Sequence, residues 1–236
     1  MVRVIGHRGA SATYNENTIE AFVAAVDQGA DGIELDVRRT ADDVLVVYHD
    51  AHLKSGEMVR RLNASELPSS IPTLVEALEA CGDTWVNIEI KNLPQDPDYD
   101  SEHGISVAVA GLVRAFDAAD RVIISSFDIS GLDRLRAADD GIPTAWLVWA
   151  QGDSNSLLER AVAHEMAAIH PHDLLVDEVF VQRAHDLGLE VNVWTIDDPN
   201  RIREMHTFGV DGIITNHPAD ALAVLKECEQ RRSVGC

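Results

Sequence analysis

The feature that most constrains the fold is the alternation of short β-rich runs with helical patterns along the whole chain. Nine runs are rich in apolar and β-branched residues: Val2–Arg8, Gly32–Val37, Val44–His49, Trp85–Lys91, Val122–Phe127, Thr144–Trp149, Ala167–His170, Val191–Ile196 and Gly212–Thr215. Between most of them the spacing of apolar residues predicts a helix, at about residues 17–28, 73–81, 103–118, 129–138, 155–166, 177–187, 199–207 and 218–231. Such alternation is typical of an α/β protein with a parallel sheet.

One connection interrupts this alternation. Only six residues, from Arg38 to Asp43, separate the second run from the third. Because a parallel crossover needs about a dozen residues or more, the third run is predicted to be the return arm of an antiparallel hairpin. If that hairpin turns near residues 41–42, His49 lies opposite Glu34.

Without the hairpin arm, eight βα units remain within the 236 residues. This count is that of a (β/α)₈ TIM barrel, which we predict as the fold. An open doubly wound sheet is the alternative, but it favours a glycine-rich phosphate loop after the first strand, and no GxGxxG is present there. No linker divides the chain, so we expect one barrel domain over residues 1–236.

Composition and charge exclude several classes of function. Apolar residues make up 46% of the chain and charged residues 25%, as in an ordinary globular protein. The formal net charge of −21 repels nucleic acid and anionic membranes, so we expect neither nucleic-acid binding nor stable membrane association. The N-terminus is typical of a strand rather than of a signal peptide. We therefore expect a cytoplasmic protein in which Cys81, Cys228 and Cys236 are free thiols.

Charged residues concentrate at the ends of the first predicted barrel strands, where a TIM barrel carries its active site. Glu34 and Asp36 are two positions apart, as are Glu89 and Lys91, so the members of each pair point to one face. Three converging carboxylates repel one another, and an oxygen-only set suits one divalent cation, Mg²⁺ or Ca²⁺. A structural ion pair between Glu89 and Lys91 is the alternative for that pair.

Two histidines flank the predicted cation site. His7 ends the first strand, and His49 ends the hairpin arm. Their position beside a cation-bound group indicates a general base and a general acid. Arg8 and Lys91 are candidates to bind the remaining charge of a phosphate.

Other residues near these strand ends carry weaker signals. Asn17 with Glu20 fits a capping box that opens the first helix, while the neighbouring Glu16 is a candidate for contact with a substrate. Trp194 and Phe127 follow strands on the same face of the barrel. Each of these two rings serves either as a packing residue or as a wall for the substrate.

Several motifs that contain these residues resemble the glycerophosphodiester phosphodiesterase family. Residues 6–10 (GHRGA), followed by residues 15–18 (NENT), are similar to the family's HRG and PENT signature. The likeness continues in the family's order through residues 34–37 (ELDV), 47–50 (VYHD), 87–91 (NIEIK), 125–128 (SSFD), 193–195 (VWT) and 211–216 (DGIITN). The resemblance therefore covers nearly the whole chain.

The resemblance implies a TIM barrel that hydrolyses a small glycerophosphodiester to glycerol 3-phosphate and an alcohol. It assigns roles to seven residues: metal ligation by Glu34, Asp36 and Glu89, acid–base catalysis by His7 and His49, and phosphate contact by Arg8 and Lys91. It also implies an insertion after the second strand, at about residues 40–72, which includes the hairpin arm and lies over the active face.

Some features depart from the family pattern or stay open. Asn15 replaces the proline of PENT, and residues 51–56 lack the Thr- and Arg-containing pattern that is common after the family's HD. The alcohol, the identity of the metal, the oligomeric state and the acid–base order of the histidines are left open. The nucleophile is either glycerol's own 2-hydroxyl, which would give a cyclic phosphate, or water.

Two other functions are compatible with this constellation. One is a related phospholipase C- or D-like phosphodiesterase that acts on lipid head groups, which the acidic charge and the lack of a docking patch disfavour. The other is a non-catalytic barrel that binds phosphorylated metabolites. The second should have lost a metal acid or a histidine, and neither is lost here.

Overall fold

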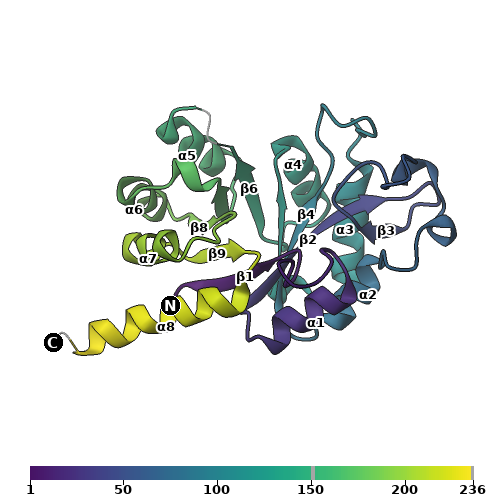
Figure 1. Cartoon of the computed structure of the whole chain (residues 1–236). Helices are drawn as coiled ribbons and strands as arrows, with labels where there is room; N and C mark the ends of the chain where they lie inside the picture. The colour runs from purple at the N-terminus through teal and green to yellow at the C-terminus, as the bar shows by residue number, and fades with distance from the viewer. Residues whose placement is uncertain (150–151, 235–236) are drawn as a thin grey trace.

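The computed structural model describes residues 1–149 and 152–234 and shows a closed parallel barrel (Figure 1). The barrel strands are β1 (Arg3–His7), β2 (Gly32–Arg39), β4 (Trp85–Ile90), β5 (Val122–Ser126), β6 (Thr144–Val148), β7 (Ala168–Pro171), β8 (Glu190–Val193) and β9 (Gly212–Thr215). They are neighbours in the order β1-β9-β8-β7-β6-β5-β4-β2, and the pairing of β1 with β2 closes the ring. This ring confirms the predicted TIM barrel.

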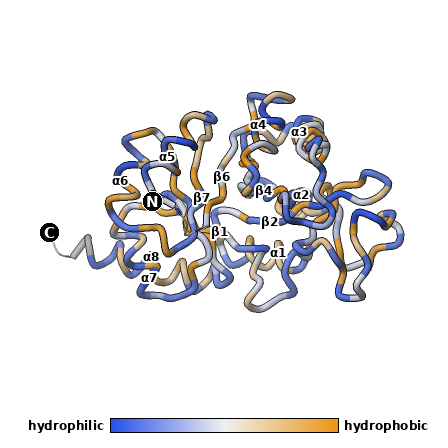
Figure 2. Tube along the Cα trace, turned by 90° about the horizontal axis from the view of Figure 1, so that it is seen from above, coloured by the Kyte–Doolittle hydropathy of each residue, from blue (hydrophilic) through white to orange (hydrophobic). Residues whose placement is uncertain are grey.

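Helices follow the barrel strands and surround them. They are α1 (Ile19–Asp27), α2 (Leu74–Ala80), α3 (Gly104–Ala115), α4 (Ile129–Ala138), α5 (Ser154–Ala163), α6 (Glu178–Asp186), α7 (Pro199–Phe208) and α8 (Pro218–Val234), with 3₁₀ turns η1 (Val59–Arg61), η2 (Ala64–Glu66), η3 (Ala119–Arg121) and η4 (Asp173–Leu175). Alternation along β2 places Ile33, Leu35 and Val37 in the main core between strands and helices. In Figure 2 apolar stretches follow inner strands such as β6.

The ends of several helices show which residues cap them. Gly29 and Gly209 end their helices with φ of 88° and 81°, the left-handed conformation that glycine adopts without strain. The predicted capping box of Asn17 and Glu20 is wrong. The N-cap of α1 is Thr18, whose side chain accepts a hydrogen bond from the Ala21 backbone. Asn17 therefore does not cap the helix, and its side chain is buried.

The hairpin arm is confirmed, but its register differs from the prediction. The arm β3 (Leu45–Val47) pairs antiparallel to β2, with Val47 opposite Val37. The prediction of His49 opposite Glu34 is wrong by one residue. The turn is longer than expected, because Thr40 bonds to Val44 across it and Asp43 takes a left-handed φ of 62°. The arm also ends at Val47, so His49 lies beyond the ladder.

The segment between β3 and α2 has a small apolar cluster of its own. Val46, Leu53 and Val59 are its buried members. Figure 1 shows this segment on the side of the barrel near β3 and α2, away from α5, α6 and α7. Within residues 1–149 and 152–234, no helix is both long and apolar enough to span a bilayer.

The barrel interior contains a histidine far from water. His170 on β7 is completely buried, and its Nε2 lies 3.0 Å from the amide nitrogen of Asn192, which donates to it. Burial, with a smaller effect of the Arg3 charge, lowers the pKa of His170 to about 3. The folded protein therefore holds this ring in its neutral form.

A pH dependence of stability follows from His170. Between its unfolded pKa of 6.5 and the folded pKa of about 3, the unfolded chain binds one more proton, so stability falls as pH falls. From pH 7 to pH 5 the wild type should lose about 2 kcal/mol more than His170→Leu. Urea unfolding of both proteins at the two pH values measures the difference. Equal losses would contradict the assignment.

Candidate active site

A cavity of about 510 Å³ opens at the carboxyl ends of the barrel strands. Its walls include most residues that the sequence singles out: His7, Arg8, Glu34, His49, Glu89, Lys91, Phe127 and Trp194. Asp36 is completely buried beside them. Glu16 does not line this cavity. Its carboxylate accepts a hydrogen bond from Arg8 at 2.9 Å and lines a second hollow beside Tyr48 and Lys54.

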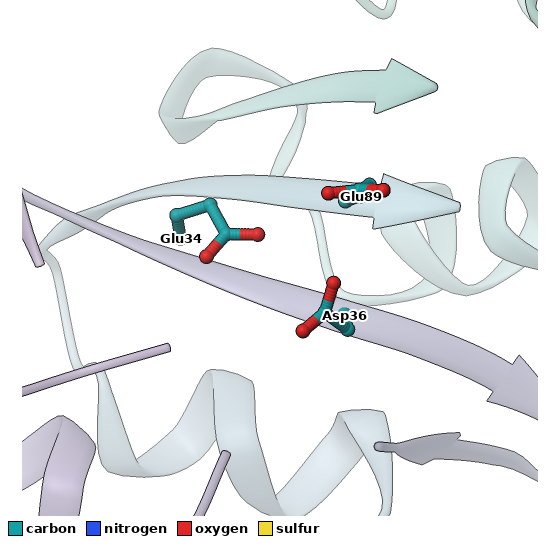
Figure 3. A group of neighbouring side chains, drawn as sticks. All are labelled: Glu34, Asp36 and Glu89. Carbon is teal, nitrogen blue, oxygen red and sulfur yellow. The ribbon is translucent and has the colours of Figure 1, made fainter. Parts of the chain in front are cut away.

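Three carboxylates meet on two adjacent strands (Figure 3). Glu34 and Asp36 project from β2, and Glu89 projects from β4, where it is the register partner of Asp36. One oxygen from each carboxylate lies within 4.8 Å of the other two. The two-residue spacing on β2 and the parallel register therefore produce the predicted cluster.

Burial makes this cluster electrostatically costly. Burial and then the charges of Asp36 and Glu89 raise the pKa of Glu34 well above its usual value. Burial also raises the pKa of Glu89, although the Lys91 charge opposes it. For Asp36, burial acts to raise the pKa, but the charges of Lys91 and Arg8 outweigh it and lower the pKa. The cluster thus depends on nearby positive charge.

Two cations compensate the three carboxylates in part. Lys91 Nζ donates to Glu89 Oε1 at 2.7 Å and lies 3.6 Å from Asp36 Oδ1. Arg8 Nε lies 3.2 Å from Asp36 Oδ2. The ion pair between Glu89 and Lys91, which was the alternative interpretation, is therefore present. The group still has three carboxylates and two cationic side chains, so ionisation of all three carboxylates would leave one negative charge in excess.

The loop after β1 is built to bring Arg8 into this position. Arg8 has a left-handed φ of 56°, and its backbone N–H donates to Glu34 Oε2 at 2.9 Å. Gly9 follows with a φ of 86°, and a Cβ atom there would lie 2.6 Å from the backbone of Ala21. Only glycine fits such a close approach, which explains the glycine of the HRG motif.

The donor set fits a hard divalent cation. All three candidate ligands offer carboxylate oxygens, which Mg²⁺ and Ca²⁺ prefer. The buried Asp36 Oδ1 has no hydrogen-bond partner among the residues that the structure describes. A buried oxygen without a donor, in a group with excess negative charge, is the environment that a cation stabilises.

His7 and His49 reach the cavity from neighbouring elements, because β1 pairs with β2, and β2 pairs with the hairpin arm that precedes His49. His7 Nε2 lies 4.0 Å from Glu34 Oε2, and burial together with the Arg8 charge lowers the pKa of His7. His49 Nδ1 lies 2.7 Å from Asp50 Oδ1. The structure therefore brings together at one cavity the two histidines that the sequence selects: His7 ends β1, and His49 follows the hairpin arm.

An arginine anchors the His49 loop. Arg38 Nε donates to the backbone carbonyl of His49 at 2.8 Å. Its guanidinium also pairs with Asp98 at 3.0 Å and with Asp96 at 3.2 Å. The long loop after β4 thus fixes the position of His49 through a buried arginine.

Three rings, those of Phe127, Trp149 and Trp194, form one side of the cavity mouth, and the ring of His172 packs against them. Phe127 and Trp149 are stacked with centroids 5.6 Å apart, and Trp149 stacks on His172 at 5.4 Å. Trp194 meets Trp149 edge-on at 4.8 Å. Phe127 and Trp194 also meet edge-on, with ring centroids 5.5 Å apart, so both lie in this cluster. Trp149 is 56% exposed, so the rim offers apolar surface to a ligand.

Sequence reasoning missed four of the residues that shape the site: Asn17, Asn87, Trp149 and Asn216. Asn17 donates to Asp36 Oδ2 at 2.8 Å and accepts from the Asp36 backbone. The NENT motif contains this residue, but the capping interpretation concealed it. Asn87 lies two positions before Glu89 on the same face, and Trp149 ends a predicted strand, so both had a detectable signal.

The chain is similar to known proteins over nearly its whole length. A sequence model described as the Glycerophosphoryl diester phosphodiesterase family matches residues 7–220. The chain is 32% identical to the glycerophosphodiester phosphodiesterase of Caldanaerobacter subterraneus subsp. tengcongensis, over 95% of this chain and 98% of that protein. It is 30% identical to the solved glycerophosphodiester phosphodiesterase of Thermotoga maritima, with a TM-score of 0.80 over 95% of this chain and 98% of the other.

A further solved structure shares the fold. A phosphodiesterase from Oleispira antarctica, solved in complex with its product sn-glycerol-3-phosphate, has a TM-score of 0.82 over 95% of this chain and 96% of the other. The two sequences are 23% identical.

The position of Asn17 predicts a role in holding Asp36. Asn17→Ala removes two hydrogen bonds to a buried aspartate and leaves alanine in a left-handed conformation, with φ of 57°. We expect the free energy of unfolding to fall by about 3 kcal/mol. The exposed Asn15→Ala is the matched control and should change it by less than about 0.5 kcal/mol. Urea unfolding measures both, and similar effects would contradict the role.

Proposed function

The chain belongs to the glycerophosphoryl diester phosphodiesterase family, and we propose that the cavity described above is where it hydrolyses a glycerophosphodiester to glycerol 3-phosphate and an alcohol. The observation that carries this proposal is the convergence of three carboxylates, two histidines and two cations at one barrel mouth. The proposed product matches the ligand of the Oleispira antarctica phosphodiesterase.

We propose that Glu34, Asp36 and Glu89 hold one divalent cation, Mg²⁺ or Ca²⁺. Such an ion, when bound, withdraws charge from a phosphate oxygen and stabilises the transition state. Burial raises the pKa of Glu34, and the charges of Asp36 and Glu89 raise it further. These two neighbouring charges support the role, because a bound cation would offset the repulsion among the three carboxylates. The family resemblance supports it as well.

The cations of the chain itself bind and orient the phosphate. Lys91 is buried and lines the cavity, and Arg8 lines it on the opposite side of Asp36. Their positive charges favour a phosphate even though the chain as a whole is strongly acidic. Phe127 and Trp194, which line the same cavity, then form the wall beside the departing alcohol.

The two histidines move the protons. One takes the proton of the attacking hydroxyl, and the other gives a proton to the oxygen of the departing alcohol. The glycerol 2-hydroxyl is an effective nucleophile because it is held on the same molecule, and its attack would give a cyclic phosphate. Water is the alternative nucleophile.

The proposal also includes the domain organisation that the sequence predicts. The chain is one barrel domain over residues 1–236, with an insertion at about residues 40–72 over the active face. His49, Asp50 and Ala51 of this segment line the cavity, which supports its position there. The cytoplasmic location and the absence of nucleic-acid and stable membrane partners stay predictions.

Metal removal tests the cation. With glycerophosphocholine as substrate, EDTA treatment should abolish the release of choline, and added Mg²⁺ or Ca²⁺ should restore it. Glu89→Gln should lower kcat/KM by about 100-fold or more, because a neutral ligand weakens the site. Full activity in the presence of excess EDTA would contradict the proposed cofactor.

The histidines are tested separately. His7→Ala and His49→Ala should each lower kcat by about 10²–10⁴-fold, since each removes a general acid or base. The exposed His52→Ala, in the same segment as His49, is the matched control and should keep kcat within about twofold. Near-normal turnover by both cavity variants would refute the assignment.

The lipid alternative is tested with the same enzyme. Soluble glycerophosphocholine should be hydrolysed at least about tenfold faster than phosphatidylcholine or lysophosphatidylcholine in vesicles that contain anionic lipid, because the −21 charge of the chain is repelled by such a surface. Faster hydrolysis of the vesicle lipid would support a phospholipase function instead. Binding of glycerophosphodiesters without any turnover would support the non-catalytic barrel.

A further inference from the structure

A chain of hydrogen bonds lies behind His7, on the side of the ring that does not face the carboxylates. His7 Nδ1 lies 2.7 Å from Asn216 Oδ1, and Ser11 Oγ donates to the same oxygen at 2.8 Å. Asn216 Nδ2 in turn donates to Asp197 Oδ2 at 2.6 Å. His7 is on β1, Asn216 follows β9, and Asp197 lies in the loop after β8, so the closure of the barrel brings these three together.

Asp197 is itself held in place. Its Oδ1 accepts hydrogen bonds from Thr215 Oγ1 at 2.8 Å and from the Asn216 backbone at 2.9 Å. Both oxygens of the carboxylate therefore have donors. This leaves Asp197 little freedom to rotate, so it can act as a fixed acceptor for Asn216.

The orientation of the Asn216 amide follows from these partners. A carboxylate has no proton to donate, so the Asn216 atom beside Asp197 must be the amino nitrogen. The atom that faces His7 is then the carbonyl oxygen, which only accepts. His7 Nδ1 must therefore carry a hydrogen, and in the neutral ring Nε2 has a free lone pair.

We propose that Asn216 and Asp197 are positioning residues that hold neutral His7 as its Nδ1–H tautomer and so present the Nε2 lone pair to the substrate. The inference rests on the proposed function, because it makes His7 the base of the first step. In that step the attacking oxygen bonds to phosphorus as its proton moves to His7 Nε2. The bond from phosphorus to the alcohol oxygen breaks as that oxygen takes a proton from His49.

The partner of Nδ1 at His49 differs from the partner of Nδ1 at His7. Its Nδ1 faces the carboxylate of Asp50, which is exposed, and not an amide. The two histidines thus have different partners at Nδ1, an amide oxygen at His7 and a carboxylate oxygen at His49. If the product of the first step is a cyclic phosphate, the oxygen of water then bonds to phosphorus as its proton moves to His49. The bond from phosphorus to the glycerol 2-oxygen breaks as that oxygen takes the proton back from His7.

The substitution Asp197→Asn tests the positioning role, because it should reverse the direction of the hydrogen bonds that lead to His7. In Asp197→Asn, the oxygen of the new amide must still accept hydrogen bonds from Thr215 Oγ1 and the Asn216 backbone N–H. Its amino group therefore faces the side chain of Asn216. Asn216 then has to turn its oxygen toward residue 197 and its amino group toward His7. We expect the Nε2–H tautomer of His7, and a fall in kcat of about 100-fold or more with KM within about threefold.

The double variant Asp197→Asn/Asn216→Asp should reverse this loss. The amide at 197 can donate to the carboxylate at 216, which can accept from His7 and Ser11, so every hydrogen bond of the wild type has a counterpart. We expect the Nδ1–H tautomer to return and kcat to recover at least about tenfold over Asp197→Asn. The neighbouring Asp198→Asn is the matched control, because Asp198 caps α7 without contacting His7.

The tautomer is measured without turnover. Two-bond ¹H–¹⁵N correlation spectra of protein labelled with ¹⁵N-histidine distinguish the Nδ1–H from the Nε2–H ring, at about pH 8 in the presence of EDTA. The His7 signals are identified by their loss in His7→Asn. Spectra with saturating Mg²⁺ and the kcat of each variant on glycerophosphocholine complete the comparison.

The outcomes are distinguishable. A wild-type Nε2–H ring, or an unchanged tautomer in Asp197→Asn, would overturn the positioning role while leaving the proposed function intact. A changed tautomer with unchanged kcat would overturn the assignment of His7 as base. If the wild type hydrolyses no glycerophosphodiester with Mg²⁺ present, the proposed function fails and the catalytic part of this inference fails with it.

Discussion

The burial of three carboxylates at one mouth of the barrel is the constraint on which the rest of the site depends. Glu34, Asp36 and Glu89 lie on adjacent strands in parallel register, so their separation is set by the sheet and cannot relax. Arg8 and Lys91 offset part of their charge. The remaining excess makes this mouth a place where a divalent cation, and then an anionic phosphate beside it, is stabilised.

The loops around the mouth serve this cluster. The left-handed backbone at Arg8 brings an N–H to Glu34, and Asn17 holds Asp36 from the start of α1. Arg38 links two loops, because it donates to the backbone carbonyl of His49 and forms an ion pair with Asp98 in the loop after β4. Candidate site residues on irregular segments are thus held in place by hydrogen bonds to buried charged groups on the rigid strands.

Much of this could be predicted from the sequence, for identifiable physical reasons. The alternation of strand and helix patterns determined the fold, and the period of two along β2 and β4 placed the acids on one face. The hairpin register was missed by one residue because a left-handed Asp43 lengthens the turn, and sequence does not show a turn's conformation at such a position. Asn17 and Asn216 were missed because an asparagine fits both a cap and a buried site, and only the folded barrel shows that each meets a charged or catalytic partner.

The most direct test of the account is the position of the cation. In crystals grown with Mn²⁺, which substitutes for Mg²⁺ in oxygen-ligand sites, anomalous scattering should show one ion within about 2.0–2.6 Å of oxygens from Glu34, Asp36 and Glu89. Such a peak, lost in Glu89→Gln crystals, is the result that the account predicts. An ion bound elsewhere in an enzyme of full activity, with no peak between these three carboxylates, would contradict it.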